Sequence, residues 1–345
     1  MSFFNIQSAQ LKILSPVDWE RSSLLPELPL VHEAISNKPV GQLVAILLCI
    51  FQGKKYLAEQ LESIANQTHR NWRIYISDDG DCTESRQIIK EFKSRYECGR
   101  IIFLSGPKCG FAANFLSLLV KSGDSADYYA FADQDDIWES KKISSAINML
   151  KSEPENIPVL YCGRSRLVDE NNEPIGFSTL FTKQPSFKNA LMQTIGGGNT
   201  MVMNKSLRNL VAEITDIEAV SHDWWVYLVV SGCGGKIFYD EVPYIRYRQH
   251  SHNLVGSNVT IYGKLKRVRM LWNGYFRHFN DVNIAAIERF KHKLTDENKN
   301  ILEVFKEARK SKFIKRLFLI KKIGLYRQTL LGNLGLLVAI IFKKL

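Results

Sequence analysis

The chain has 345 residues, of which 45% are hydrophobic and 23% charged, a composition that excludes a disordered chain and allows one large domain with appendages, or two domains. Its six cysteines form no Cys-x-x-Cys pair and no dense framework, which favours a reducing compartment such as the cytosol. The net charge of +11 arises at the C-terminal end: residues 261–345 carry 20 Lys or Arg and 6 Asp or Glu, whereas the other 260 residues carry 26 basic and 29 acidic side chains.

The character of the chain changes near Leu43. Residues 1–42 mix polar residues with short apolar pieces, and we expect an N-terminal extension without a signal peptide, since no basic segment leads into a long apolar run. Residues 44–51 are continuously apolar, which is typical of a buried parallel strand. After Gln52-Gly53, apolar residues recur every three or four positions from Leu57 to Ile64, which predicts a helix with one buried face.

Further strands and helices follow in alternation. We expect strands over 72–76, 101–104, 128–132, 159–162 and 235–240, and helices over 83–95, after 110, over 141–151 and after 221. Strands that alternate with helices of about a dozen residues predict an α/β fold with a mostly parallel sheet flanked by helices. Neither G-x-G-x-x-G nor a P-loop follows the first strand, so we exclude a nucleotide site of either type.

Two of the predicted strands end in clustered acids. These are Asp78-Asp79 after the second strand, and Asp133, Asp135 and Asp136 after the central strand. Ligands bind outside the carboxyl ends of strands in open α/β sheets, and if the two strands were neighbours, five carboxylates would meet there. Acids this close repel each other unless a cation or several donors neutralise them, and Mg²⁺ held by carboxylates and substrate phosphates would do so. Alternatively, Asp135 and Asp136 complement the dipole of a helix beginning near Trp138, which leaves Asp133 unexplained.

Three later segments also carry candidate functional groups. Glycines 196–198 precede Asn199, and they permit either close approach of the backbone to a ligand or a flexible turn. Asp223 stands beside two tryptophans, as a first-turn helix acid or as a general base next to a sugar-binding wall. His250 and His252 would share one face of a strand, where they could ligate a metal or form a packed edge.

Five stretches in series resemble the family 2 glycosyltransferases of the GT-A fold. They read CIFQGKKYLAEQLESIANQTHRNWRIYISDDGD, FADQDDIW, GGGNTMVMN, HDWW and YRQHSHNLVG. The resemblance covers residues 43–257 and is closest to bacterial rhamnosyltransferase-like members that build surface polysaccharides. It implies a sugar donor linked to a nucleotide diphosphate, either UDP or dTDP, and a divalent metal, Mg²⁺ or Mn²⁺.

The resemblance also implies a place for each part of the nucleotide. Asp78 would accept a hydrogen bond from N3 of the uracil or thymine, with Asp79 supporting it, and Asp133 would bind the ribose. Phe51 would pack on the base, but it stands in Phe51-Gln52-Gly53, where the family usually has Tyr-Asn-Gly. Because a hydroxyl and a short amide are missing there, the choice between uridine and thymidine stays open.

The remaining roles implied by the resemblance concern the diphosphate and the acceptor. Asp135 would reach the metal that bridges the diphosphate, Arg248 and His250 would close over it, and His250 would complete the metal shell. Asp223 would be the general base that deprotonates the acceptor hydroxyl. We expect an acceptor or sugar pocket formed by Asp136, Trp138, Gly198, Asn199, His222 and Trp224.

The C-terminal region lies outside this motif set. We expect a glycosyltransferase domain over residues 43–260 and a basic, amphipathic helical tail over 261–345. Residues 264–272 and 312–322 mix lysine and arginine with aliphatic and aromatic residues, and the apolar run 330–342 is shorter than the roughly 20 residues of a membrane-spanning helix. This pattern favours an interfacial helix on anionic lipid, and a helical bundle with a solvated basic face is the alternative.

Together these features predict an inverting, metal-dependent glycosyltransferase. It would move a sugar, with rhamnose as one candidate, onto a lipid-linked or otherwise membrane-borne glycan during surface polysaccharide synthesis. We expect it in the cytoplasm, peripheral on the inner face of the plasma membrane. The alternatives are a nucleotide-sugar hydrolase, or a nucleic-acid-binding protein that uses the basic tail. Against the second, the basic tail is interleaved with aliphatic residues and the rest of the chain is net acidic, so we expect no nucleic-acid partner.

Overall fold

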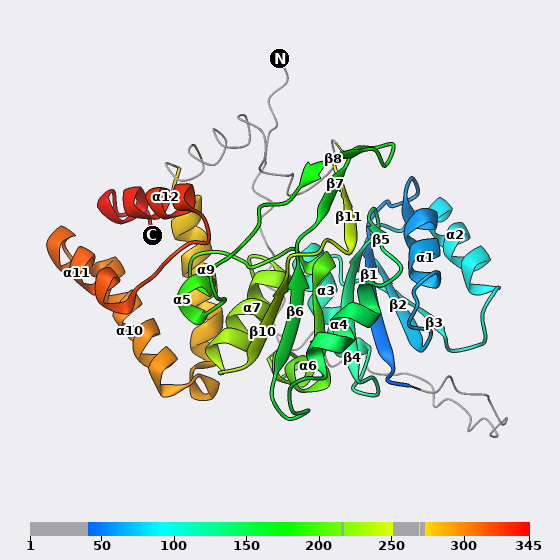
Figure 1. Ribbon diagram of the computed structural model, residues 1–345, viewed down its shortest axis with the longest axis horizontal. Helices are drawn as coiled ribbons and strands as arrows, with labels where there is room; N and C mark the ends of the chain where they lie inside the picture. Colours follow the sequence, from blue (N-terminus) through cyan, green and yellow to red (C-terminus); the bar gives the residue numbers. More distant parts are fainter. Residues whose placement is uncertain (1–40, 215–216, 251–268, 270–272) are drawn as a thin grey trace, which may run out of the picture. The chain divides into compact units, whose positions relative to one another are not determined.

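A computed structural model describes residues 41–214, 217–250, 269 and 273–345 (Figure 1). Its main element is a seven-stranded sheet in the order β10-β6-β9-β4-β1-β2-β3. The strands are β1 Val44–Ile50, β2 Trp72–Asp78, β3 Ile101–Ser105, β4 Tyr128–Asp133, β6 Val159–Gly163, β9 Val202–Asn204 and β10 Lys236–Asp240. Only β9 pairs antiparallel with its neighbours in this sheet. The predicted α/β fold with a mostly parallel sheet is confirmed.

A second sheet has four strands in the order β5-β11-β7-β8. Its first strand, β5, comes directly after the acidic end of β4 in the chain. Its strands are β5 Ile137–Trp138, β7 Arg166–Val168, β8 Pro174–Phe177 and β11 Ile245–Arg248. The alternative of a helix beginning near Trp138 is wrong, because Trp138 pairs antiparallel with Ile245 and the next helix begins only at Lys142. The acids before Trp138 therefore do not act as helix-capping residues.

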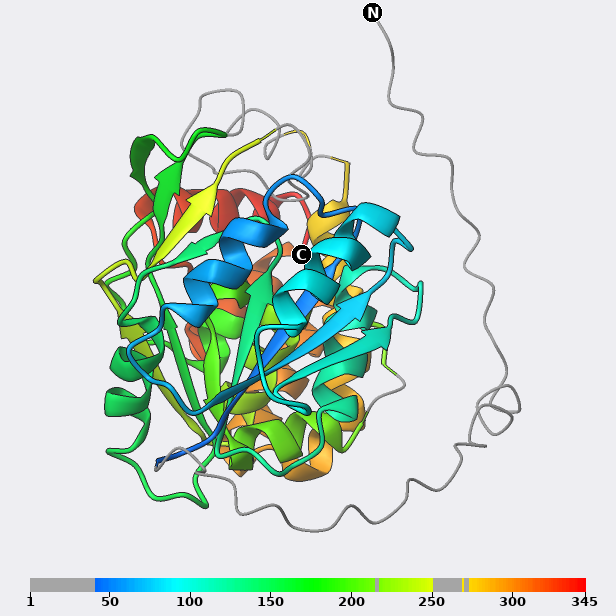
Figure 2. The ribbon, with the colours of Figure 1, turned by 90° about the vertical axis from the view of Figure 1, so that its right-hand side faces the viewer.

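Helices cover both faces of the main sheet. They are α1 Leu57–Ala65, α2 Thr83–Lys93, α3 Phe111–Lys121, α4 Lys142–Leu150, α5 Phe187–Ala190, α6 Lys205–Ala212, α7 His222–Gly232, α9 Tyr275–Arg289, α10 Asp296–Lys310, α11 Phe313–Ile323 and α12 Leu330–Ile341, with short 3-10 turns η3 Gly198–Thr200 and η4 Lys291–Lys293. Alternate residues of β1 belong to two core clusters: Ile46 packs with α1, α2 and α4, and Leu47 packs with α3 and α7. Figure 2 shows α1 and α2 in front of the sheet. Both faces of β1 are buried, which explains its unbroken apolar sequence.

The C-terminal helices belong to the core on the α7 side of the sheet. Ten of the eleven residues of α7 are buried, because the sheet covers one side of the helix and buried residues of α9 and α10 cover another. Buried residues of α11 and α12 join the same cluster, and these two helices contact each other (Figure 1). Of the basic segment 264–272, the structure describes only Arg269, and His252 also lies outside the described residues.

Candidate active site

The register of the sheet determines how the acidic strand ends lie. Ile50 of β1 pairs with Asp78 of β2, and Cys49 of β1 pairs with Asp133 of β4. The sequence allowed the two acidic strands to be neighbours. In the structure they are not, because β1 lies between them. The loop that begins at Phe51 consequently leaves the sheet between two groups of carboxylates.

The acids at the end of β2 are held by their own loop, by α2 and by the loop after β3. Asp78 is buried, and its carboxylate accepts hydrogen bonds from the Gly80 amide at 2.9 Å and from the Arg86 guanidinium at 3.3 Å. The Lys108 amide donates to Asp79 Oδ1 at 2.8 Å. Burial raises the pKa of Asp79, and the amide of Lys108 opposes that effect. This corner thus holds two fixed carboxylates beside the first loop.

The acids after β4 have much less compensation. Burial raises the pKa of Asp133 well above its usual range, and the charges of Asp135 and Asp223 raise it further. Burial also raises the pKa of Asp136, and the charges of Asp135 and Asp133 add to this, whereas hydrogen bonds from Asn199 at 2.6 Å and from the Arg248 amide oppose it. Repulsion of this kind marks a place where added positive charge would be stabilised.

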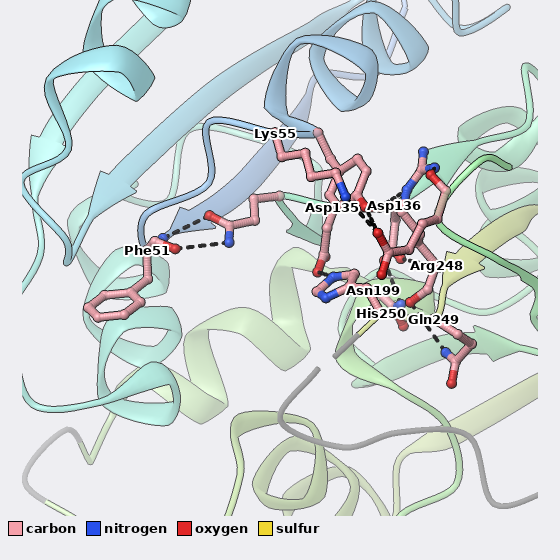
Figure 3. A network of polar contacts seen from close by, with 11 residues as sticks. Phe51, Lys55, Asp135, Asp136, Asn199, Arg248, Gln249 and His250 are labelled. Atoms are coloured by element: carbon pink, nitrogen blue, oxygen red, sulfur yellow. Dashed lines mark hydrogen bonds and ion pairs between the residues drawn. The ribbon is translucent and has the colours of Figure 1, made fainter. Parts of the chain in front are cut away.

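Asp135 and His250 are the pair best placed to bind a metal. His250 Nε2 lies 2.7 Å from Asp135 Oδ2, and both side chains are at most one-fifth exposed (Figure 3). Among the described residues, no group of three or more His, Cys, Asp or Glu side chains surrounds a common point. Magnesium bound by one or two carboxylates and by substrate phosphates does not need such a cage. Asp135 and His250 therefore offer two donors that fit a divalent cation shared with a substrate.

Gln134, for which the sequence motifs predicted no role, connects this acidic loop to the first loop. The Phe51 amide donates to Gln134 Oε1 at 2.8 Å, and Gln134 Nε2 donates back to the Phe51 carbonyl at 3.0 Å (Figure 3). A Cβ on Gly53 would collide with the Gln134 side chain, which explains the glycine. The Phe51 ring remains 60% exposed, and it is available to a flat ligand. The position of Gln134 between two acids was the only sequence signal for this contact.

Arg248 lies beneath the site and is only 2% exposed. Its guanidinium donates to the carbonyls of Asp135 at 3.1 Å and Glu170 at 2.8 Å, and it pairs with the Glu59 carboxylate. It also lies 4.3 Å from the centre of the Tyr56 ring. Arg248 thus ties β11, the acidic loop and α1 together, and its expected role at the diphosphate stays a prediction.

The N-terminus of α7 brings two further candidates to the site. Asp223 is half-buried, and its Oδ1 accepts a hydrogen bond from the Trp224 amide at 2.8 Å. His222 is buried and stacks on Phe115 at a centroid distance of 3.9 Å, and burial lowers its pKa to about 4, so the ring is neutral at pH 7. A Cβ on Gly198 would collide with His222 Nε2, so this glycine permits close packing of η3 on α7.

Both tryptophans expected in the sugar pocket lie in the core. Trp138 is 3% exposed and Trp224 is 8% exposed, and the Trp224 indole donates to the Ala190 carbonyl at 2.6 Å. Burial of such large apolar surfaces stabilises the fold, so we assign both side chains to packing and leave them out of the pocket. Lys142, which the sequence analysis did not single out, is buried with its amine 3.9 Å from the Trp138 ring, and burial lowers its pKa to about 7.

Part of the chain matches a known protein family, and longer stretches resemble individual proteins. The family model described as "Glycosyl transferase family 2" matches residues 45–211. The dTDP-rhamnosyl transferase RfbG of Shigella flexneri is 29% identical over 249 residues, which cover 67% of this chain and 81% of the relative. The Escherichia coli enzyme named UDP-Glc:alpha-D-GlcNAc-diphosphoundecaprenol beta-1,3-glucosyltransferase WfgD is 27% identical over 48% of this chain and 62% of its own. Staphylococcus aureus TarS, solved with UDP-GlcNAc, aligns at 12% identity and a TM-score of 0.49 over 81% of this chain and 90% of that chain.

Proposed function

Since the chain carries a glycosyl transferase family 2 domain and is a glycosyltransferase, we propose that it moves a sugar from a nucleotide diphosphate to a membrane-borne glycan acceptor with inversion of configuration. The observation that carries this proposal is the meeting of Phe51, the acids of β2 and β4, and Asp223 at one edge of the sheet. The name of RfbG makes dTDP-rhamnose the first donor to test. The name of WfgD makes a diphosphoundecaprenol-linked glycan the first acceptor.

We assign the nucleotide to the side of β1 that faces β2. The carboxylates of Asp78 and Asp79 would accept from the base, and the exposed ring of Phe51 would stack on it. Asp133 would bind the ribose. Asp135 and His250 would hold a divalent cation, Mg²⁺ or Mn²⁺, which when bound neutralises charge that develops on the diphosphate.

Asp223 is the group we assign to the acceptor. Its Oδ1 already receives one hydrogen bond at the N-terminus of α7, and among the described residues no hydrogen bond reaches its Oδ2. This oxygen would accept the proton of the acceptor hydroxyl as the acceptor oxygen bonds to the anomeric carbon. The bond from that carbon to the diphosphate oxygen breaks on the opposite face and leaves its electron pair on the phosphate. One displacement of this kind inverts the configuration at the anomeric carbon.

The test is a transfer assay with the full chain. It supplies UDP- and dTDP-linked sugars with a synthetic lipid diphosphate glycan, and NMR reads the configuration of the new linkage. We expect transfer from one donor class and a product whose anomeric configuration is opposite to that of the donor. Retained configuration would refute the single-displacement assignment, and donor cleavage without transfer to any acceptor would refute the proposed reaction.

We place this reaction at the inner face of the plasma membrane, in surface polysaccharide synthesis. An activated nucleotide sugar and an acceptor linked to a membrane lipid meet at that surface. Among the described residues, no helix is long and apolar enough to cross a bilayer. A surface of the protein that binds lipid would keep the enzyme at this acceptor.

A further inference from the structure

Exposed apolar side chains gather on the last two helices. Of the 16 large hydrophobic residues that are most exposed in the described part of the chain, nine lie between residues 313 and 342. They are Phe313, Ile314, Phe318, Leu330, Leu331, Leu334, Leu337, Ile341 and Phe342, and we call them the α11–α12 apolar face. Exposed apolar residues are normal when they are scattered singly, but a group this large marks an interaction surface.

The spacing on α12 shows that its part of this face is a continuous stripe. Leu330, Leu334, Leu337 and Ile341 follow one another at intervals of four, three and four residues, so they share one side of the helix, and they are 86%, 58%, 45% and 40% exposed. Leu336, Ala339 and Ile340 form the opposite, buried side. The helix therefore uses one aliphatic side for the core and presents a second one outward. On α11, Ile314 and Phe318 form a similar exposed pair at 80% and 66%.

The charged side chains of the segment that carries this face are all positive, and one of them, Lys315, pairs with Glu307 of α10 at 2.7 Å. Residues 311–345 contain eight Lys or Arg and no Asp or Glu. Lys312, Lys315, Lys321 and Lys322 are exposed on or beside α11, and Lys343 is exposed directly after α12. Exposed lysines beside apolar side chains can place their charges at lipid headgroups while the apolar side chains enter the acyl region. A protein partner of ordinary composition gives no reason for such a one-sided charge.

From these two observations we propose that α11 and α12 dock the enzyme on an anionic bilayer through the α11–α12 apolar face, with the lysines on phosphate headgroups. The inference rests on the proposed function for its purpose, which is to keep the enzyme at its lipid-linked acceptor. Its physical basis, exposed aliphatic residues on a segment with eight basic and no acidic side chains, is independent of catalysis.

The test measures cosedimentation of the full chain with vesicles of phosphatidylglycerol and phosphatidylcholine, and with vesicles of phosphatidylcholine alone. We expect binding to the anionic vesicles that weakens as salt rises, and much weaker binding to the neutral ones. Leu334→Gln with Leu337→Gln, and separately Lys321→Gln with Lys322→Gln, should each lower the vesicle affinity by about tenfold or more.

Two control variants remove the same kinds of group elsewhere. Ile175→Gln with Phe177→Gln removes exposed apolar residues of β8, and Lys90→Gln with Lys93→Gln removes exposed lysines of α2. Both should bind vesicles like the unchanged chain, and all four variants should keep its thermal midpoint. Equal losses in controls and test variants would overturn the proposal. So would failure of the unchanged chain to bind, or a leucine variant that only turns an oligomer into a monomer.

Transfer to a short, water-soluble acceptor separates this inference from the proposed function. An enzyme that transfers sugar in solution but ignores anionic vesicles would overturn the docking surface and leave the reaction standing. A chain that binds vesicles through α11 and α12 but transfers no sugar would overturn the reaction and leave the docking surface standing.

Discussion

Asp223 is the residue whose role separates catalysis from binding most cleanly. In Asp223→Asn the side chain keeps its size and can still accept the bond from the Trp224 amide, but it cannot take a proton from an acceptor. We expect turnover at saturating donor and acceptor to fall by about 10²–10⁴, the range for loss of a general base. Donor affinity should hardly change. If Asp223 serves only as a first-turn acid of α7, the variant would keep nearly full turnover and lose about 0.3–1 kcal/mol of stability.

Asp135 is the residue that should couple the donor to a metal. Asp135→Asn removes the charge that faces His250, and we expect it to abolish the difference in donor affinity between solutions with and without Mn²⁺. Isothermal titration with the nucleoside diphosphate measures this difference directly. Asp124→Asn removes an exposed acid elsewhere and is the matched control. An unchanged metal effect in the Asp135 variant would contradict the assignment.

Gln134 should matter for the donor although we expect it to touch no part of it. Gln134→Ala removes both hydrogen bonds to the Phe51 backbone and frees the first loop from the acidic loop. If each bond is worth about 1 kcal/mol, donor affinity should fall by about 10- to 30-fold. The KM for the acceptor should not change, since Asp223 lies on another element. Gln87→Ala, on the exposed side of α2, is the control, and equal donor affinity in both variants would contradict the role.

Secondary-structure elements were the part of the molecule that sequence predicted best. The continuous apolar run of β1 and the spaced apolar residues of α1 each reflect a local period, which does not depend on the rest of the chain. The two-residue strand β5 was not predictable in this way, because its partner Ile245 is more than 100 positions away. The separation of the two acidic strands by β1 was hidden for the same reason.

The candidate site was predictable where a motif carried it and not where packing decided it. Asp135 and His250 came from separate motifs, and the structure brings them to hydrogen-bonding distance. Trp224 came from a motif as well, yet its indole lies in the core, because sequence alone does not say which side of α7 faces the sheet. The roles of Gln134 and Lys142 were not predicted, since their residue types do not reveal a contact with the backbone of Phe51 or with the ring of Trp138.

The contact between α3 and α7 should make stability depend on pH. His222 fills this contact by stacking on Phe115, and burial lowers its pKa from 6.5 to about 4. Between pH 6.5 and 4, His222 is protonated in the unfolded chain but neutral in the folded chain. The free energy of unfolding therefore falls as the pH drops through this window. The full effect is about 3 kcal/mol.

Thermal midpoints at pH 7 and near pH 4.5 test this contribution. His222→Leu should be less stable than the unchanged chain at pH 7, because it loses the ring stacking on Phe115, but it should lose less stability on acidification. His292→Leu changes an exposed histidine and should keep the acid sensitivity of the unchanged chain. An unaltered pH dependence in His222→Leu would show that other groups dominate acid unfolding.

At the scale of the whole molecule, one side of the basic C-terminal helices packs into the protein core and the other side is exposed. Its inner side chains, such as Leu319 and Ile340, belong to the same buried cluster as α7. The loop before α12 is also tied to the segment that leads into α5: the Lys183 amide donates to Gln328 at 3.0 Å, and the Tyr326 hydroxyl lies 2.9 Å from that of Ser186. The candidate base Asp223 therefore lies on a helix whose buried residues belong to the same core cluster as those of the last two helices.

A truncation that removes residues 311–345 should accordingly damage the fold as well as any attachment to membranes. It exposes the core residues against which α11 and α12 pack. The six buried apolar residues that it removes are Leu319, Ile320, Ile323, Leu336, Ala339 and Ile340. Losing even one large core side chain costs about 2–5 kcal/mol, so we expect a large drop in the thermal midpoint and little transfer to a soluble acceptor. Leu334→Gln with Leu337→Gln changes only exposed positions of α12, so this variant should keep both the thermal midpoint and the transfer to a soluble acceptor. A truncated chain with the thermal midpoint and soluble activity of the full one would show instead that α11 and α12 are an appendage, and that α7 is held by the sheet and by α9 and α10 alone.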